Sequence, residues 1–152
     1  MDLKFIDENH VYLDGEKLHK KRGREVDFAR FIYYNDKYFV KIDFSSGRQC
    51  TMEWKKWNEC YDNHKKFFTP AIYFGNIETL DGVHTITERK RFKKKPNPLK
   101  HKETKEFLEV LEFYDLRWDA DIGEHDGSMV NCGITTSNKI MCYDYGRLAQ
   151  HY

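Results

Sequence analysis

Five side chains of the sequence have the chemical types needed to handle a nucleoside triphosphate and its metal ion. In chain order they are Lys41, Glu53, Asp126, Asn131 and Asp144. A lysine can contact phosphates, and a carboxylate can hold that lysine in place. A second carboxylate can orient or deprotonate an attacking hydroxyl, while a carboxylate and an amide oxygen can bind Mg²⁺, a hard cation that prefers oxygen ligands. The sequence therefore holds a candidate for each role in phosphoryl transfer.

The lysine lies in a predicted β-hairpin. The runs VDFARFIYY (residues 26–34) and KYFVKIDF (residues 37–44) are rich in aromatic and β-branched residues, and Asn35-Asp36 separates them. Such runs around a tight turn are typical of two antiparallel strands. Lys41 falls in the middle of the second run, in FVKI, where a lysine is unusual.

The first carboxylate lies in a predicted helix that follows the hairpin. Ser46 followed by Gln49 fits a capping box, and Glu53 comes in the first turns after it. Aromatic residues then recur at helical spacing: Trp54, Trp57 and Tyr61. We expect a helix of about three to four turns that Thr69-Pro70 ends.

The remaining three candidates surround a predicted hairpin near the end of the sequence. Asp126 and Asn131 flank GSMV, and Asp144 opens the triplet DYG. Between them, CGITT and KIMCY flank Ser137-Asn138, a pattern that indicates two short strands and a turn. This hairpin would run directly into Asp144.

The other segments complete an α+β pattern. Residues 3–18 alternate apolar and polar side chains around Asp14-Gly15 and indicate a first hairpin. Residues 71–75 and 83–92 indicate strands, and residues 103–116 a second helix with one apolar face. The stretch KKKPNPLKHK between them is predicted to be a loop, because Pro96 and Pro98 exclude a helix.

Composition narrows the class of protein. The 152 residues include 26 Lys+Arg and 25 Asp+Glu, so the net charge of +1 gives no global case for binding nucleic acid or a membrane. No apolar run approaches the roughly 18–20 residues that span a bilayer, and no signal peptide opens the sequence. The four cysteines form no C-x-x-C pair, so we expect free thiols in a reducing cytoplasm.

The order of these motifs resembles the protein-kinase fold. FVKI, the helix with Glu53, the spacing D-x-x-x-x-N and the triplet DYG correspond to its V-A-I-K, helix-C glutamate, H-R-D-x-x-x-x-N and D-F-G motifs. NCGI followed by a hairpin and DYG looks even more like the short kinase-like proteins of bacteriophages. The resemblance covers roughly residues 26–146.

The resemblance implies a single kinase-like domain over residues 1–152. Residues 1–88 would form an N-lobe, a twisted antiparallel sheet plus one helix. Residues 89–102 would be a basic linker, and residues 103–152 a minimal C-lobe of one helix, a catalytic loop and a hairpin.

The resemblance also implies roles, with ATP and Mg²⁺ as cofactors. Lys41 would contact the phosphates and Glu53 would hold Lys41. Asp126 would orient the acceptor hydroxyl. Asn131 and Asp144 would bind Mg²⁺.

The sequence departs from the family where glycines normally cover the phosphates. Gly23 is the only glycine before the first kinase-like strand, but Arg22 and Arg24 sit at about the same place. Guanidinium groups can bind phosphate bidentately, so Arg24 joins the predicted nucleotide site. Glu88, at the end of the strand that leads to the hinge, is also predicted to belong to this site. Only RLAQHY follows DYG, so we expect no activation segment and no helical lobe for peptide substrates.

Two functions fit this pattern. The first is an ATP- and Mg²⁺-dependent phosphotransferase directed at a host target. The alternative is a catalytically degenerate kinase fold that docks on a host protein or nucleic acid in the host cytoplasm. Docking would use the basic loop, which holds eight Lys and Arg residues from Arg89 to Lys102.

Each candidate residue also has a purely structural interpretation. Lys41 could point outward from an edge strand, and Glu53 could be one more solvated helix charge, with Glu59 competing for its role. The D-x-x-x-x-N pair could shape a turn, because Asp and Asn favour turns. Asp144 could cap a final turn, and the basic loop could simply be solvated.

Overall fold

The computed structural model describes residues 1–21, 30–44, 48–77, 82–94, 98–116, 132–143 and 145. The chain forms two compact units. The first comprises Met1–Trp54 and Ala71–Arg89, and the second Lys55–Pro70 and Lys90–Tyr152. Residues 55–70, which fall within the expected 1–88 lobe, thus belong to the second unit.

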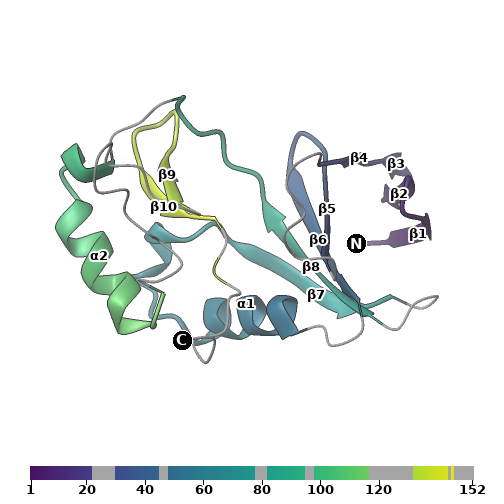
Figure 1. The fold of residues 1–152 in the computed structure, drawn as a ribbon, viewed down its shortest axis with the longest axis horizontal. Coiled ribbons are helices and arrows are strands. Elements are labelled where there is room, and N and C mark those ends of the chain that lie inside the picture. The colour runs from purple at the N-terminus through teal and green to yellow at the C-terminus, as the bar shows by residue number, and fades with distance from the viewer. Residues whose placement is uncertain are drawn as a thin grey trace. The chain divides into compact units, whose positions relative to one another are not determined.

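The first unit is built on an antiparallel sheet, called the large sheet below, with strand order β4-β5-β6-β8-β7 (Figure 1). The strands are β4 (His19–Lys20), β5 (Arg30–Tyr34), β6 (Tyr38–Phe44), β7 (Ala71–Asn76) and β8 (Gly82–Glu88). The predicted hairpin around Asn35-Asp36 is confirmed in its described part, because β5 pairs with β6. The Asn35 side chain accepts hydrogen bonds from the backbone N–H groups of Lys37 and Tyr38, which closes the turn.

A smaller sheet in the same unit consists of β1 (Leu3–Asp7), β2 (His10–Leu13) and β3 (Glu16–Lys17). Asp14 and Gly15 link β2 to β3 with φ angles of 49° and 83°. Two positive φ angles at the centre of a two-residue loop fit a type I′ turn, which Asp-Gly favours. The predicted hairpin at Asp14-Gly15 is therefore confirmed, and β1 adds a further strand to it.

Strand alternation gives the large sheet two different faces. Val40 and Ile42 of β6 point into an apolar core shared with the small sheet. The members of this core are Val11, Leu13, Leu18, Tyr33, Val40, Ile42, Ile77 and Ile86. Because successive side chains of a strand point to opposite faces, Lys41 and Asp43 point away from this core.

The helix α1 (Arg48–Glu59) follows the large sheet's β6 strand in sequence. The helix was predicted correctly, but its expected end at Thr69-Pro70 was wrong. It ends at Glu59, and only the short 3-10 turn η1 (Lys65–Phe67) follows before β7. Asp62 and Asn63 explain the early end, because such residues bond to nearby backbone groups and favour turns over helix interiors. Ser46, half of the predicted capping box, lies outside the described residues.

The second unit contains α2 (Thr104–Phe113), the 3-10 turn η2 (Pro98–Lys100), and the strands β9 (Cys132–Ile134) and β10 (Ile140–Cys142). The predicted hairpin of β9 and β10 is confirmed, with Asn138 at a φ of 64° in its turn. The expectation that Pro98 excludes helical structure was wrong for this short turn. Proline is tolerated at a first helical position, where its missing N–H group would have had no partner.

The core of the second unit is rich in aromatic and sulfur-containing side chains. Its buried members are Cys60, Phe67, Phe68, Phe107, Val110, Leu111, Leu116, Cys132, Ile140, Cys142 and Tyr145. Backbone contacts flank the hairpin on both sides, since Phe68 bridges Cys142 and Phe92 bridges Thr135. Two segments that precede the hairpin in sequence, around Phe68 and Phe92, therefore extend the β9–β10 pair.

A Schellman motif ends α2. The N–H of Leu116 donates to the carbonyl of Leu111 at 2.7 Å, and the N–H of Asp115 donates to that of Glu112 at 3.1 Å. Asp115 has a φ of 56°, the left-handed conformation this motif requires. Leu116 and Leu111 are both buried, which supplies the apolar contact that accompanies the motif.

The observed elements agree with the α+β class predicted from sequence. All strand pairs within the sheets of the described chain are antiparallel, and α1 and α2 are its α-helices. Within the residues that the structure describes, neither helix has the length and apolar composition required to cross a membrane.

Candidate functional site

Lys41 occupies a central strand of the large sheet. Within β6, Lys41 pairs with Ile32 of β5 on one side and with Thr85 of β8 on the other. Its side chain is only 6% exposed. The alternative interpretation, an outward-pointing lysine on an edge strand, is therefore wrong.

The Lys41 ammonium is paired with Glu53 of α1. The distance from Lys41 Nζ is 2.9 Å to Oε1 and 3.0 Å to Oε2 of Glu53, so both carboxylate oxygens accept a hydrogen bond. The Glu53 side chain is 0% exposed, which excludes a solvated helix charge. Glu59, the competing glutamate, is 65% exposed and lies 4.0 Å from Lys55. The expected ion pair between Lys41 and a helix carboxylate is thus confirmed, and its partner is Glu53.

The stability of the fold does not account for this ion pair. Removing two charges from water costs several kcal/mol per ion, and apolar residues of similar volume often stabilise a protein as well or better. The opposite face of the same sheet is built from valine, isoleucine and tyrosine side chains. A buried lysine and glutamate at this position therefore mark a candidate functional site.

Polar contacts surround the pair on the same face of the sheet. The Asp43 carboxylate accepts a hydrogen bond of 2.6 Å from the backbone N–H of Cys50 in α1. The Cys50 thiol donates to the Lys41 carbonyl at 3.3 Å, and the Thr85 hydroxyl donates to the Cys50 sulfur at 3.6 Å. These contacts tie the beginning of α1 to β6 and β8. Neither Asp43 nor Cys50 was predicted from the sequence, although Asp43 is two residues from Lys41 and so shares its face.

An aromatic pair lies beside the ion pair in sequence and structure. Trp54, the residue after Glu53, stacks on Phe74 of β7 with ring centroids 6.2 Å apart and planes at 17°. Phe74 pairs in register with Thr85, which in turn pairs with Lys41. The stack fixes the rotation of α1 on the same face of the sheet.

The structure places one further predicted site residue, Glu88. It ends β8 and pairs with Tyr38 of β6. Thr85 pairs with Lys41, so both side chains lie on the same face of the sheet. Because side chains alternate along a strand, Glu88, three residues after Thr85, lies on the opposite face and does not reach the ion pair. The predicted site residues Arg24, Asp126, Asn131 and Asp144 lie outside the described residues.

Asn131 and Asp144, the residues predicted to bind Mg²⁺, are among those that the structure does not describe. Within the described part, no group of three or more His, Cys, Asp or Glu side chains has metal-binding geometry. The predicted site needs only Asn131 and Asp144 from the protein, with phosphate and water oxygens supplying the rest. The donor types therefore suit Mg²⁺, and their arrangement stays a prediction.

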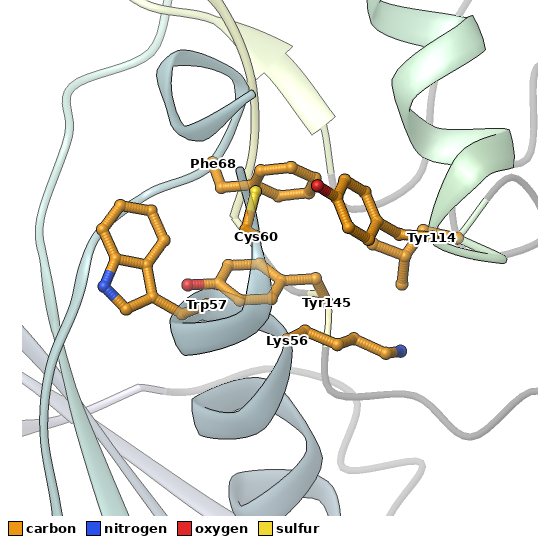
Figure 2. Close-up of a pocket in the computed structure, with 7 residues that line it drawn as sticks. Lys56, Trp57, Cys60, Phe68, Tyr114 and Tyr145 are labelled. Atoms are coloured by element: carbon orange, nitrogen blue, oxygen red, sulfur yellow. The ribbon is translucent and has the colours of Figure 1, made fainter. Parts of the chain in front are cut away.

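A small pocket lies within the second unit (Figure 2). Its lining residues are Lys56, Trp57, Cys60, Phe68, Tyr114, Leu116 and Tyr145. The volume open to the centre of a water-sized sphere is only about 10 Å³, roughly the room of one water. Figure 2 shows the rings of Phe68, Tyr114 and Tyr145 gathered around the Cys60 side chain.

The Cys60 thiol and the Tyr114 hydroxyl, which line this pocket, both stay protonated near pH 7. Burial raises the pKa of the Cys60 thiol. Burial, together with a hydrogen bond to Cys60, raises the pKa of Tyr114 to about 12. A protonated thiol is a poor nucleophile. The pocket is therefore part of the core rather than a reactive site.

The structural role of Tyr145, the central residue of DYG, was not predicted from the sequence. It is buried, its ring centroid lies 5.2 Å from that of Phe68, and its hydroxyl donates to the carbonyl of Thr69 at 2.7 Å. Its aromatic type between Asp144 and Gly146 was the available signal. Tyr145 anchors the end of the hairpin in the core of the second unit.

Comparisons with known proteins identify a similar fold. No protein-family model matches the chain, and no curated protein matches it. Among solved structures, the chain is similar to WbdD, known from a high-resolution crystal structure, with a TM-score of 0.55 and 11% sequence identity. The match covers 86% of this chain and 33% of the WbdD chain, so the chain spans about a third of that protein's length. At this identity the likeness concerns the fold alone.

Proposed function

We propose that the protein is a minimal kinase-like phosphotransferase that uses ATP and Mg²⁺. The observation that carries the proposal is the buried, two-oxygen ion pair between Lys41 and Glu53 in the large sheet. In phosphoryl transfer, a lysine held by a helix carboxylate is the group that contacts the nucleotide phosphates. The order of motifs that resembles protein kinases supports the same interpretation.

The proposed roles follow the chemistry of each side chain. Lys41, oriented by Glu53, binds the phosphates, and Arg24 contributes a guanidinium where glycine N–H groups are lacking. Asn131 and Asp144 supply oxygen ligands for Mg²⁺, which neutralises phosphate charge when bound. Asp126 takes the proton of the acceptor hydroxyl as that oxygen attacks the terminal phosphate, and ADP leaves. The resemblance to bacteriophage proteins makes a host molecule the proposed acceptor and the host cytoplasm the proposed location.

A calorimetric titration with ATP, with and without Mg²⁺, tests this function. The informative variant is Lys41→Met with Glu53→Leu, because exchanging both charges for apolar groups of similar volume preserves the core. The matched control is Lys55→Met with Glu59→Leu, which removes an exposed pair from the same helix. We expect Mg²⁺-dependent binding in the wild type and control but not in the buried-pair variant. Absence of binding to the wild type, or equal binding by both variants, would overturn the proposal.

A second candidate function is docking through a basic surface of the second unit. We define the basic surface by the described residues Arg91, Lys93, Lys94, Lys100, Lys102 and Lys139. All six are exposed. The residues from Arg89 to Lys102 include no acidic side chain. A surface of one charge attracts a partner of the opposite charge.

The specific observation in favour of docking is that the hairpin turn holds this surface in place. Lys93 Nζ donates to the side-chain oxygen of Asn138 at 3.2 Å, and His101 Nε2 contacts the Asn138 carbonyl at 2.8 Å. Backbone hydrogen bonds join Lys93 to Ile134 and Arg91 to Thr136. Segments from before and after the prolines thus converge on one turn.

The partner proposed for the basic surface is an acidic host protein. Phe92, the aromatic residue within the segment, packs on Tyr143 at 5.3 Å between ring centroids. Its ring also lies against the buried Gly133 of β9, and its half-buried side chain leaves little area for stacking on the bases of single-stranded nucleic acid. The surface is mainly lysine, and a lysine ammonium acts as a point charge, whereas arginine can bind a phosphate group bidentately.

Charge reversal tests the docking function. Replacing Lys93, Lys94 and Lys95 with Glu should abolish capture of the partner, and rising salt should weaken wild-type binding because exposed charges are screened. The control carries the same charge change elsewhere, at the exposed Lys4, Lys37 and Lys55. Capture that survives charge reversal, or that is independent of salt, would exclude the basic surface. Capture of nucleic acid instead of protein would reassign the partner.

A further inference from the structure

β6 holds α1 at two points rather than one. Asp43 accepts the N–H of Cys50, and Lys41 donates to Glu53. Lys41 and Asp43 are two residues apart on one face of the strand, and Cys50 and Glu53 are three residues apart on one face of the helix. The strand separation of about 6.6 Å and the helix rise of about 4.5 Å are similar enough for both contacts to form together.

The order of the contacts fixes the direction of the helix. Asp43, further along β6, meets the start of α1, whereas Lys41, earlier in β6, meets a residue one turn later. The helix therefore runs back along the strand that precedes it. A shift of α1 by one residue would break the Asp43 contact and move Glu53 away from Lys41.

We propose that Asp43 is a positioning residue for the Lys41–Glu53 pair. In this role Asp43 acts by fixing α1 through the N–H of Cys50. What the positioned pair is used for rests on the proposed nucleotide-binding function. The positioning itself concerns the strand and helix alone.

The chemistry of Asp43 suits this role. A helix start has backbone N–H groups without intrahelical partners, and a carboxylate both accepts from them and interacts favourably with the helix dipole. Asp43 is only 4% exposed, so water competes little for the hydrogen bond. The Cys50 thiol and the Thr85 hydroxyl extend the attachment to the Lys41 carbonyl and to β8.

The contact to test is the hydrogen-bond acceptor at position 43. Asp43→Asn keeps an oxygen that can accept the Cys50 N–H, while Asp43→Ala removes it, and Asp43→Val does so with a residue that favours strands. A matched core control is Val11→Ala, which truncates a fully buried side chain of β2 in the core between the small sheet and the opposite face of the large sheet.

The primary readout is independent of nucleotide. An NMR spectrum of the lysine ammonium groups should show a slowly exchanging Lys41 signal in the wild type, because the group is buried and bonded to both Glu53 oxygens. The signal should persist in Asp43→Asn and Val11→Ala and disappear in Asp43→Ala or Asp43→Val. A Lys41 signal that is unchanged in both acceptor-free variants, or that is lost equally in Val11→Ala, would overturn the positioning role.

The second readout separates this proposal from the proposed function. The acceptor-free variants should bind ATP with Mg²⁺ about tenfold more weakly than the wild type, the fold-change that corresponds to 1.4 kcal/mol, while Asp43→Asn stays close to the wild type. A wild type without ATP affinity would refute the nucleotide function and leave the NMR result to decide on Asp43. Equal ATP affinity in all variants, with the Lys41 signal lost, would show that the pair does not serve the nucleotide.

Discussion

The environment of each charged side chain decides what it can do in this protein. Lys41 and Glu53 are charged groups in the interior of the first unit, and they form an ion pair with each other. Glu59 and Lys55 have the same chemistry on the surface of the same helix, where their separation is 4.0 Å. Exposed pairs of this kind contribute little, whereas a buried charge that loses its partner is costly.

Removing one member of the buried pair should therefore destabilise the protein more than removing both. Lys41→Met alone should lower the free energy of unfolding by about 3–5 kcal/mol, because Glu53 stays buried without its cation. The double variant with Glu53→Leu should lose much less. Urea denaturation of both variants checks this. A double variant that is less stable than Lys41→Met would contradict the account of the pair.

His84 should make stability depend on pH. It is 3% exposed, and burial lowers its pKa from 6.5 to about 4, against a smaller opposing contribution from the Gly75 backbone. The unfolded chain therefore binds a proton at a higher pH than the folded chain. This contribution to stability is complete above pH 6.5 and declines as the pH falls towards 4.

The measurement is denaturant unfolding between pH 7 and pH 4.5, roughly the range between the pKa values of His84 in the unfolded and folded states. His84→Leu removes the titrating group, so its free energy of unfolding should fall less steeply with pH than that of the wild type. Carboxylates contribute to both slopes, and only the difference between the two proteins reports on His84. Parallel slopes would show that His84 is not held neutral by the fold.

Some structural elements are determined by residues close together in the sequence, and others depend on contacts between distant segments. The hairpins were predicted from sequence because Asn35-Asp36, Asp14-Gly15 and Ser137-Asn138 carry the turn chemistry themselves. The end of α1 was not, because Tyr61, which lies beyond the helix, continues the helical spacing of Trp54 and Trp57. Contacts across elements, such as Asp43 with Cys50, have no local signal.

The end of α2 offers a test at the level of one element. Asp115 adopts a φ of 56°, which an L-residue with a side chain adopts at a cost and glycine adopts freely. Asp115→Gly should raise the free energy of unfolding by about 0.5–1 kcal/mol. Glu112→Gly, in the helix itself, should lower it by about 1 kcal/mol. Thermal unfolding of both variants is the measurement, and a destabilised Asp115→Gly would contradict the Schellman motif.

At the scale of the whole molecule, sequence and structure contribute different parts of the candidate site. The sequence supplied the α+β class, the order of motifs and the candidates Lys41 and Glu53. The structure adds which glutamate pairs with Lys41, the attachment through Asp43 and the buried position of Tyr145. These contacts depend on which face of a strand packs against which face of a helix. Sequence periodicity predicts the faces of each element but not which faces pack together, so it cannot select one partner among several acidic residues.

The central claim is that Lys41 contacts the phosphates of a bound nucleotide. Labelling with an amine-reactive acyl phosphate of ATP, followed by peptide mass spectrometry, tests it directly, because the reagent transfers its acyl group to a lysine beside the phosphates. The account predicts preferential labelling of Lys41 that excess ATP with Mg²⁺ suppresses. Labelling confined to exposed lysines such as Lys93, with Lys41 unmodified whether or not ATP is present, would contradict it.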